Sequence, residues 1–410
     1  MQLVEFLQAA SYELLPPSYM NEIKKSLLIT IDFPPQFGGV AAYYKHVCQN
    51  LPPDKIIVLA PGQSQDLAFD RRQSFGIVRD KNLAGLNRPA GRLFGKTAQR
   101  FRLLRFYRTL KLIVKHHKIQ MILVGQVLPL GALALFLKKR RNIPYIFFSH
   151  GLDITLPQSS PRKKMLLKKI IASAQSIVAN SYFTHDELVK LGAEPKKIAV
   201  VYPAPNLSAG HLPEEKIKDF ASRHNLLGKK ILLTVGRLVK RKGHDLVLKA
   251  LPQIIKEAPN LVYLIAGDGP ERGKLQDYVL QNGLSDHVLF LKNVNNSDLS
   301  AGYQLADVFI MPSRRLNNGD VEGFGIAYLE ANAFGKPVIG GKSGGVPEAI
   351  LHEKTGLLVN PTNTQDIAQA AIKLLTDEAL AHRLGIQGLE RVHSDFNWPT
   401  QVEKIKELLT

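Results

Sequence analysis

Cysteine and tryptophan are almost absent from this chain of 410 residues, which has one of each. With Cys48 alone no intrachain disulfide can form, and a reducing compartment is expected. The sequence has no Cys/His cluster with metal-ligand spacing and no Asp-x-Asp pair, so it predicts no metal site and no bound cofactor. It also lacks a charged-then-apolar signal pattern. Residues 1–19 are either a short arm or lie before a true start at Met20.

Long hydrophobic runs are scarce as well. The longest uncharged run, Ile119–Leu137, has the length of a membrane span. Gly125, Pro129 and Gly131 interrupt it, however. We therefore predict a buried strand over Met121–Val124, followed by a helix.

Acidic residues are scarce in the first half of the chain. Residues 1–205 contain 30 Lys and Arg against 12 Asp and Glu, whereas residues 206–410 contain 24 against 23. Nearly all of the net charge of +19 therefore lies in the first half. Between Asp80 and Asp186 the only acid is Asp153. This asymmetry indicates an anionic partner for the first half.

The length favours two domains, because one hydrophobic core rarely serves so many residues. Short apolar strands alternate with helices in the first half, with strands expected at 26–31, 56–59, 121–124, 144–148 and 176–179 and a long basic helix at 97–117. After a linker near 203–208 the pattern restarts, with strands expected at 231–235, 261–266, 288–291, 308–311 and 337–340. Apolar strands alternating with helices predict an α/β protein with two doubly wound, Rossmann-like domains.

The most informative motif holds Glu322 and Glu330 with seven residues between them. Gly323 and Gly325 allow a tight turn, and Ile326–Phe334 is expected to form a helix. The eight steps span about 12 Å, enough to hold both ends of a nucleotide-sugar, and a helix N-terminus favours a diphosphate. The alternative is a surface helix with two unrelated glutamates.

With Pro312-Ser-Arg before it and Ser343-Gly-Gly-Val-Pro-Glu348 after it, this motif resembles the retaining GT-B glycosyltransferases of glycosyltransferase family four. The wording is most similar to that of the phosphatidylinositol mannosyltransferase branch. The resemblance covers nearly the whole chain and implies two Rossmann-like domains facing across a cleft. It implies an acceptor-side domain over residues 1–204 and a nucleotide-sugar-binding domain over residues 205–393. A C-terminal helix, about 394–410, is expected to cross back to the first domain.

A cationic segment follows the first strand of the second domain. Gly236, Arg237 and Lys242 lie at a strand-to-helix turn, where open α/β sheets bind ligands. The planar guanidinium and the point charge of lysine suit a diphosphate, and the resemblance assigns Arg237 and Lys242 to the donor pyrophosphate and to catalysis. Lys240 and Arg241 are interpreted as ordinary solvated cations.

Two segments of the first domain are expected to face the donor. Gly38 and Gly39 follow the first strand, where glycine lets backbone amides approach phosphate or sugar oxygens. The resemblance places this loop against the donor phosphate and sugar. It assigns His150, at a strand end, to a donor-sugar or catalytic contact, while the residue type alone fits a polar strand end equally well. Asp153 is a weaker candidate that would face the acceptor.

The resemblance implies further donor contacts along the second domain: Gly267, Val294, Glu322, Gly323, Phe324, Gly325 and Glu330. Glu322 is expected to be catalytic at the sugar end of the donor. Its replacement by alanine should then abolish transfer and leave stability nearly unchanged. The segment 343–345 should shape the wall beside the diphosphate, and Glu348 should be structural.

The resemblance implies a retaining hexosyltransferase that moves mannose from GDP-mannose onto a lipid-linked or polysaccharide acceptor. It implies same-face attack by the acceptor, with the leaving phosphate taking the proton. A UDP-hexose donor stays open, and a catalytically inactive scaffold is disfavoured because every donor-side position is intact. From another class, the basic stripe Arg88–Lys118 with Phe101, Phe106 and Tyr107 would fit a nucleic-acid-binding protein. The helical spacing of these aromatic residues favours packing over base stacking. The nucleic-acid-binding alternative also leaves Glu322 unexplained.

The same basic stripe predicts reversible contact with an anionic membrane surface. Its cations are Arg92, Lys96, Arg100, Lys111, Lys115 and Lys118, and its apolar residues are Phe101, Leu103, Leu104, Phe106 and Leu110. The expected location is cytoplasmic, peripheral on the inner face of the membrane.

Overall fold

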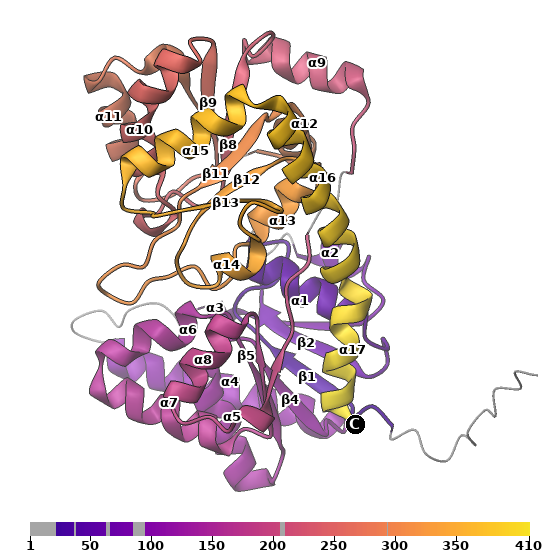
Figure 1. Cartoon of the computed structure of the whole chain (residues 1–410). Helices are drawn as coiled ribbons and strands as arrows, with labels where there is room; N and C mark the ends of the chain where they lie inside the picture. The colour runs from indigo at the N-terminus through magenta and orange to yellow at the C-terminus, as the bar shows by residue number, and fades with distance from the viewer. Residues whose placement is uncertain (1–21, 37, 63–65, 85–94, 206–209, 293) are drawn as a thin grey trace, which may run out of the picture.

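The computed structural model describes residues 22–410 except 37, 63–65, 85–94, 206–209 and 293, and no side chains for residues 84 and 95–103. Two domains lie one above the other, each built on a parallel sheet with helices on both faces (Figure 1). The predicted α/β fold with two doubly wound domains is confirmed. Residues 1–19, which were interpreted as an arm or as preceding the true start, lie outside the described residues. Part of the expected linker does so too.

The first domain carries a sheet of seven parallel strands in the order β3-β2-β1-β4-β5-β6-β7. The strands are β1 (Ser26–Ile29), β2 (Ile56–Pro61), β3 (Gly76–Asp80), β4 (Met121–Val124), β5 (Tyr145–Ser149), β6 (Ser176–Ala179) and β7 (Ile198–Val200). The helices are α1 (Gly39–Gln49), α2 (Leu67–Asp70), α3 (Lys81–Ala84), α4 (Gly95–His116), α5 (Leu130–Arg141), α6 (Leu152–Thr155), α7 (Pro161–Ser173) and α8 (Tyr182–Lys190).

The second domain carries a sheet of six parallel strands in the order β10-β9-β8-β11-β12-β13. The strands are β8 (Lys230–Val235), β9 (Leu261–Ala266), β10 (Val288–Leu291), β11 (Val308–Met311), β12 (Val338–Gly341) and β13 (Gly356–Val359). The helices are α9 (Glu214–Arg223), α10 (His244–Glu257), α11 (Arg272–Gln281), α12 (Asn296–Leu305), α13 (Ile326–Ala333), α14 (Val346–Ala349), α15 (Thr364–Thr376), α16 (Glu378–Asp395) and α17 (Trp398–Leu409).

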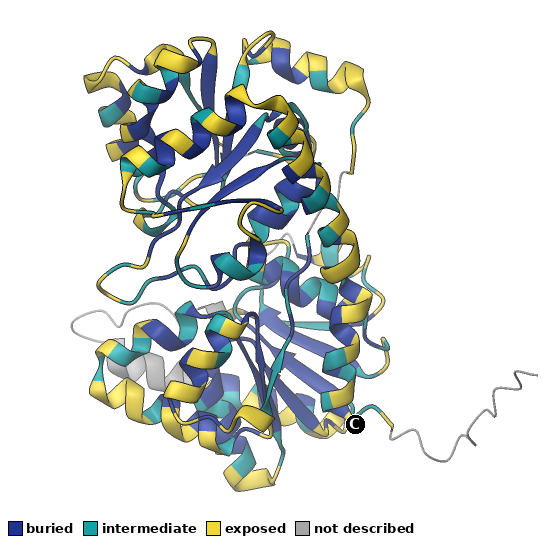
Figure 2. Cartoon of the chain, in the orientation of Figure 1, coloured by how far each residue is buried: buried dark blue, intermediate teal, exposed yellow. Residues whose placement is uncertain are grey.

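Central strands are buried on both faces because their side chains alternate between two layers of helices (Figure 2). In β1, Leu28 packs in one hydrophobic cluster, while Leu27 and Ile29 pack in another on the opposite face. The cluster that contains Leu28 continues into the second domain, where it includes Phe324. The two domains therefore share one apolar core at their junction.

The C-terminal helices connect the domains a second time. Helix α16 runs down the second domain, and α17 then packs against α1 of the first (Figure 1). The ring of Trp398 lies between His46, with which it stacks at 5.0 Å, and Tyr43 at 5.2 Å. The crossing that the resemblance implied is present. The limits of 204 and 205 for the two domains stay predictions.

The apolar run Ile119–Leu137 forms β4 and the start of α5, as predicted. None of the described helices is long and apolar enough to cross a membrane. Sequence reasoning missed three strands, β3, β7 and β13, and each lies at an edge of its sheet. β3 includes Arg79 and Asp80, and β7 has only three residues, so neither gives a long apolar run.

Candidate active site

The carboxyl ends of strands from the two sheets meet at the domain junction. Gly39, at the start of α1, lies so close to α13 that an added methyl group would be 3.3 Å from Ile326 Cδ1. Gly151, after β5, lies equally close to the second domain, since an added methyl group would be 3.1 Å from Gly323 Cα. The structure therefore brings the diglycine loop, the His150 turn and the glutamate motif together.

Glu322 binds two cations from the segment that follows β8. Its carboxylate lies 2.6 Å from Lys242 Nζ and 2.8 Å from Arg241 Nη1. Burial raises the pKa of Glu322, but the charges of Lys242 and Arg241 outweigh it and lower the pKa to about 2. Burial lowers the pKa of Lys242, and the charge of Glu322 acts against this. The carboxylate is therefore ionised across the physiological range.

The prediction that Arg241 is a solvated cation is wrong. Its side chain is 15% exposed and pairs with Asp320 at 2.9 Å as well as with Glu322. No local sequence pattern indicates this contact, because Arg241 and Glu322 are 81 positions apart. Only the fold, which places β8 beside β11, joins the two segments.

These contacts also change the expectation for Glu322. Sequence reasoning placed it in an open donor site, where its loss would leave stability nearly unchanged. In the structure its loss would leave Lys242 and Arg241 without a shared counterion in a buried setting. Breaking such a pair typically costs about 3–5 kcal/mol.

A second arginine supports the loop that carries Glu322. Arg314 donates two hydrogen bonds to Asp245, at 2.9 and 2.8 Å, and its backbone N–H donates to the Arg241 carbonyl at 2.8 Å. Gly243 is required between these residues, because its φ is +83° and an added methyl group would be 2.4 Å from the Pro312 carbonyl oxygen. The segment after β8 and the loop after β11 are thus locked together.

Glu330, on α13, accepts a hydrogen bond from Tyr303 Oη at 2.8 Å. Tyr303 was missed by sequence reasoning, because it lies on α12 far from the motif. Gly325 precedes α13 with φ of +101°, a conformation that favours glycine. The first amides of α13 therefore lie between the two glutamates, as the motif predicted.

Arg237 differs from Arg241 and Lys242 because its side chain is exposed, and Lys240 is exposed as predicted. Its charge acts on Asp32 of the first domain: burial raises the pKa of Asp32, and a hydrogen bond from Gln126 and the charge of Arg237 partly offset this. Behind Arg237, the backbones of β8 and β9 meet, since a methyl group on Gly267 would be 2.0 Å from the Gly236 carbonyl oxygen. Both predicted glycines lie at this strand edge.

His150 forms the facing wall together with Tyr44. Tyr44 Oη donates to the Gly125 carbonyl oxygen and lies 2.8 Å from His150 Nε2. A hydroxyl has one hydrogen, and a carbonyl can only accept, so Nε2 carries the proton and donates to Tyr44. Burial lowers the pKa of His150 to about 4. At neutral pH the ring is uncharged, and its Nδ1 is an acceptor.

Asp153 lies beneath the His150 turn. One carboxylate oxygen accepts from the His150 backbone N–H at 2.9 Å and from Ser149 Oγ at 3.2 Å. The other oxygen is buried and has no partner among the described residues. Burial raises the pKa of Asp153 to about 6, against these hydrogen bonds. The structure thus places it as a support of His150, and not on an open acceptor face.

Two other predicted donor contacts are placed in the apolar core. The ring of Phe324 is buried against Tyr202 and Phe396, at 5.3 and 5.7 Å, so only its backbone can face a donor. Val294 is partly buried against the shared cluster. Its predicted contact with the base stays a prediction.

Two family models match complementary parts of the chain. "Glycosyltransferase Family 4" matches residues 37–208, and "Glycosyl transferases group 1" matches residues 215–391. The chain is a glycosyltransferase of family four. It has the GT-B fold, and it is an enzyme of the transferase class.

Relatives of nearly equal length share low identity with this glycosyltransferase. One relative is a GDP-mannose-dependent α-(1-6)-phosphatidylinositol monomannoside mannosyltransferase from Mycolicibacterium smegmatis. The two sequences are 29% identical, and the alignment covers 94% of this chain and 98% of the relative. This chain is also 28% identical, over 95% of its length, to 99% of the corresponding monoacylated-substrate enzyme from Corynebacterium glutamicum. The crystal structure of HepE from Anabaena with UDP and glucose superposes with a TM-score of 0.77 at 18% identity, over 94% of this chain and 99% of that one.

Among the described residues, no group of three or more His, Cys, Asp or Glu side chains is arranged to hold a metal ion. Arg241 and Lys242 pair with Glu322, Arg241 also pairs with Asp320, and the charge of Glu330 acts on Lys242. Arg237, which is exposed directly after β8, has no ion-pair partner among the described residues, so its charge is available to an anion. Such an arrangement can bind a diphosphate.

Proposed function

We propose that this glycosyltransferase transfers mannose from GDP-mannose, with retention of configuration, to a phosphatidylinositol mannoside or a similar lipid-linked acceptor. The observation that carries the proposal is the group of cations in the segment after β8, Arg237, Arg241 and Lys242. The Glu322 loop that binds Arg241 and Lys242 meets the His150 turn across the junction. The donor nucleotide and the acceptor class are taken from the relatives named above.

In this proposal, the second domain stabilises the charge that develops on the leaving diphosphate. Arg237 and Lys242 bind the phosphate oxygens, and the N-terminus of α13 adds backbone N–H groups. Glu322 fixes the position of Lys242 and reaches the sugar. Because Lys242 and Glu322 are preorganised in a buried setting, they act more strongly than they would in water.

The first domain holds the sugar in this proposal. Neutral His150 accepts a hydrogen bond from a sugar hydroxyl through Nδ1, and the amides near Gly39 approach the phosphate. The acceptor hydroxyl attacks from the face that the diphosphate leaves, and its proton passes to the departing phosphate oxygen. No protein carboxylate is required as a nucleophile.

We place the lipid acceptor on the basic outer surface of the first domain. Helices α4, α5 and α7 lie side by side, as the Tyr107–Phe136 ring contact at 5.4 Å shows for the first two. Among their described side chains, the large exposed apolar residues are Leu104, Leu112, Phe136 and Met165. Exposed cations around them include Lys111, Lys115, Lys139, Arg140, Lys163, Lys164, Lys168 and Lys169. Several cations near an anionic surface give about 1 kcal/mol each, so reversible binding at the inner face of the membrane follows.

The composition of that surface corrects the sequence prediction. Phe106 and Leu110 were expected to contribute apolar surface, but both are fully buried in the core of the first domain. Arg92, Lys96, Arg100, Phe101 and Leu103 lie outside the described side chains. Since Phe106 is buried, it also cannot stack on a nucleic-acid base, and nothing in the described stripe favours that alternative.

The test is a transfer assay with GDP-mannose or UDP-glucose as donor and a phosphatidylinositol mannoside in vesicles as acceptor. We expect transfer from GDP-mannose and an α-linked product by NMR. Transfer only from UDP-glucose would reassign the donor, and no transfer from either would reject the proposed function.

A vesicle co-sedimentation experiment tests the membrane surface separately. Lys168→Glu with Lys169→Glu should weaken binding to phosphatidylglycerol vesicles at low salt, whereas Lys373→Glu, on the exposed face of α15, should not. Equal binding by both variants, or none by the wild type, would place the acceptor elsewhere.

A further inference from the structure

The domain junction contains a carboxylate that binds across it. Glu348 lies on α14 of the second domain, yet its two oxygens accept hydrogen bonds from the backbone N–H groups of Tyr182 and Phe183, at 2.6 and 2.7 Å. These are the first two amides of α8 in the first domain. A carboxylate is favoured at a helix N-terminus by the free amides and by the helix dipole.

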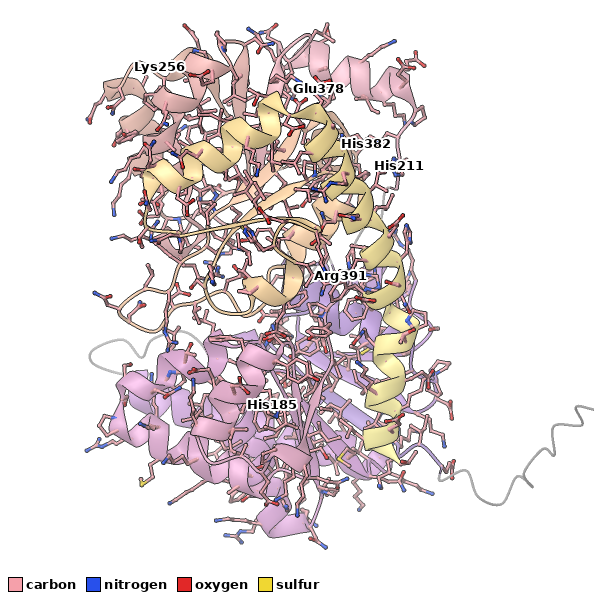
Figure 3. The ribbon with its side chains drawn as sticks, in the orientation of Figure 1. His185, His211, Lys256, Glu378, His382 and Arg391 are labelled. Carbon is pink, nitrogen blue, oxygen red and sulfur yellow. The ribbon has the colours of Figure 1, made fainter. Side chains whose placement is uncertain are left out.

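The segment between β7 and the linker supplies a third hydrogen bond to the same group. Tyr202 Oη donates to Glu348 at 3.1 Å. The ring of Tyr202 packs on Phe324 and Phe396, so this segment, the donor loop and the C-terminal crossing meet at this carboxylate. Arg391, from α16, donates to the Glu348 and Ala349 carbonyl oxygens at 2.8 and 3.0 Å and so holds α14 from behind. Figure 3 labels Arg391 where α16 passes the junction, and His185 on α8 below it.

The segment before Glu348 is fixed to the loop that carries Glu322 and Gly323. The Gly345 N–H donates to the Glu322 carbonyl oxygen at 3.0 Å. Methyl groups added to Gly344 or Gly345 would lie 2.2 Å from the Glu322 carbonyl oxygen and 2.0 Å from the Gly323 carbonyl oxygen. Any movement of Glu348 is therefore passed to the backbone at Glu322.

The segment before α8 is fixed to His150 in the same way. Asn180 Nδ2 donates to the His150 carbonyl oxygen at 3.4 Å. An added methyl group on Gly323 would lie 2.0 Å from that same carbonyl oxygen and 3.0 Å from Asn180 Nδ2. An ion pair also reaches α8 from the second domain, Arg315 to Glu187 at 3.8 Å.

We infer that Glu348 is a positioning residue that latches the second domain onto α8 and so holds His150 against the Glu322 loop. Resting on the proposed function, this assigns Glu348 to the step in which sugar and diphosphate are held by different domains. Without the latch, the second domain still has Arg237 and Lys242 for the diphosphate. The loss therefore falls on turnover and on domain closure, and not on nucleotide affinity.

The test compares Glu348→Ala and Glu348→Gln with Glu353→Gln, an exposed glutamate five residues further on. For Glu348→Ala we expect kcat to fall roughly tenfold or more, with GDP affinity by calorimetry within about threefold of wild type. Glu348→Gln keeps one acceptor oxygen, so we expect its kcat to lie between the kcat of Glu348→Ala and that of wild type. The kcat of Glu353→Gln should match wild type. Small-angle X-ray scattering should show a larger radius of gyration for Glu348→Ala than for wild type.

Retained GDP binding and an unchanged circular dichroism spectrum ensure that the variants are folded. The inference is overturned if folded Glu348→Ala keeps the wild-type radius of gyration and kcat. It is also overturned if GDP affinity falls in parallel with kcat, because Glu348 would then act on the nucleotide. If wild type transfers no sugar, the proposed function fails, while the scattering comparison still tests the latch. Tyr202→Phe, which removes only the hydroxyl contact, should give a smaller effect than Glu348→Ala.

Discussion

The two walls of the candidate site differ in the kind of polarity they offer. On the second domain, Glu322, Lys242 and Arg241 are charged and paired, and the pKa of Glu322 is about 2. On the first domain, His150 is neutral at physiological pH, with a pKa of about 4, and Tyr44 holds its ring. Fixed charges suit a diphosphate leaving group, whereas neutral acceptors suit the recognition of hydroxyls.

The distribution of charge within the site differs from the distribution of charge along the whole chain. The first half carries nearly all the net positive charge, and many of its exposed cations lie on α4, α5 and α7. The second half is nearly neutral in sum, yet it places its buried cations at the donor loop. Net charge therefore predicts a surface partner and says little about the active site.

The largest effect should come from removing the charge that holds the second wall together. Glu322→Gln leaves Lys242 without its ion-pair partner in a buried setting, while Arg241 keeps only Asp320. The free energy of unfolding should therefore fall by about 3–5 kcal/mol, and transfer should be lost. Chemical denaturation at pH 7 measures this, with the exposed Glu403→Gln as control. A fully stable Glu322→Gln would contradict the ion-pair account.

The same pair predicts a pH dependence of stability. Because the folded-state pKa of Glu322 is lowered to about 2, its contribution is present above its unfolded value, near 4.5, and is lost as pH falls toward 2. The stability gap between wild type and Glu322→Gln should therefore narrow between pH 5 and pH 2.

Next in size is the loss of diphosphate affinity. Arg237→Ala and Lys242→Ala should each weaken GDP binding by roughly tenfold or more, with non-additive effects in the double variant because they share one ligand. The two should differ in stability: Arg237 is exposed, so its loss should cost little, whereas Lys242 is paired with Glu322. Calorimetry with GDP that finds unchanged affinity in both variants would move the diphosphate site elsewhere.

A change on the first wall should separate turnover from nucleotide binding. His150→Phe keeps a planar ring but removes both ring nitrogens, so we expect kcat to fall roughly tenfold while GDP affinity stays at the wild-type value. Steady-state kinetics and calorimetry give the two quantities. An equal loss of both would place His150 on the nucleotide and not on the sugar.

The smallest effect concerns Asp153 beneath His150. Its folded-state pKa of about 6 lies above the unfolded value of 3.8, so its contribution to stability is present below 3.8 and is lost as pH rises through about 6. Asp153→Asn does not titrate. Its melting temperature relative to wild type should therefore rise between pH 4 and pH 7, and a constant difference would show that Asp153 titrates normally.

Much of the fold could be predicted because central parallel strands are apolar on both faces, as in Met121–Val124. β3 and β7 were missed because β3 ends in Arg79 and Asp80 and β7 has only three residues. In the site, local motifs identified Glu322, Lys242 and the Gly325 turn. Arg241, Tyr303 and Tyr44 were missed because their partners lie far away in sequence, and only the packing of strands and helices brings them together.

The most direct test of the account is transfer from GDP-mannose to a phosphatidylinositol mannoside in vesicles, in the presence of EDTA. The account predicts release of GDP and formation of an α-linked mannoside at the rate seen without chelator, because the cations of the second wall stabilise the leaving diphosphate. Loss of transfer in EDTA that magnesium or manganese restores would contradict it.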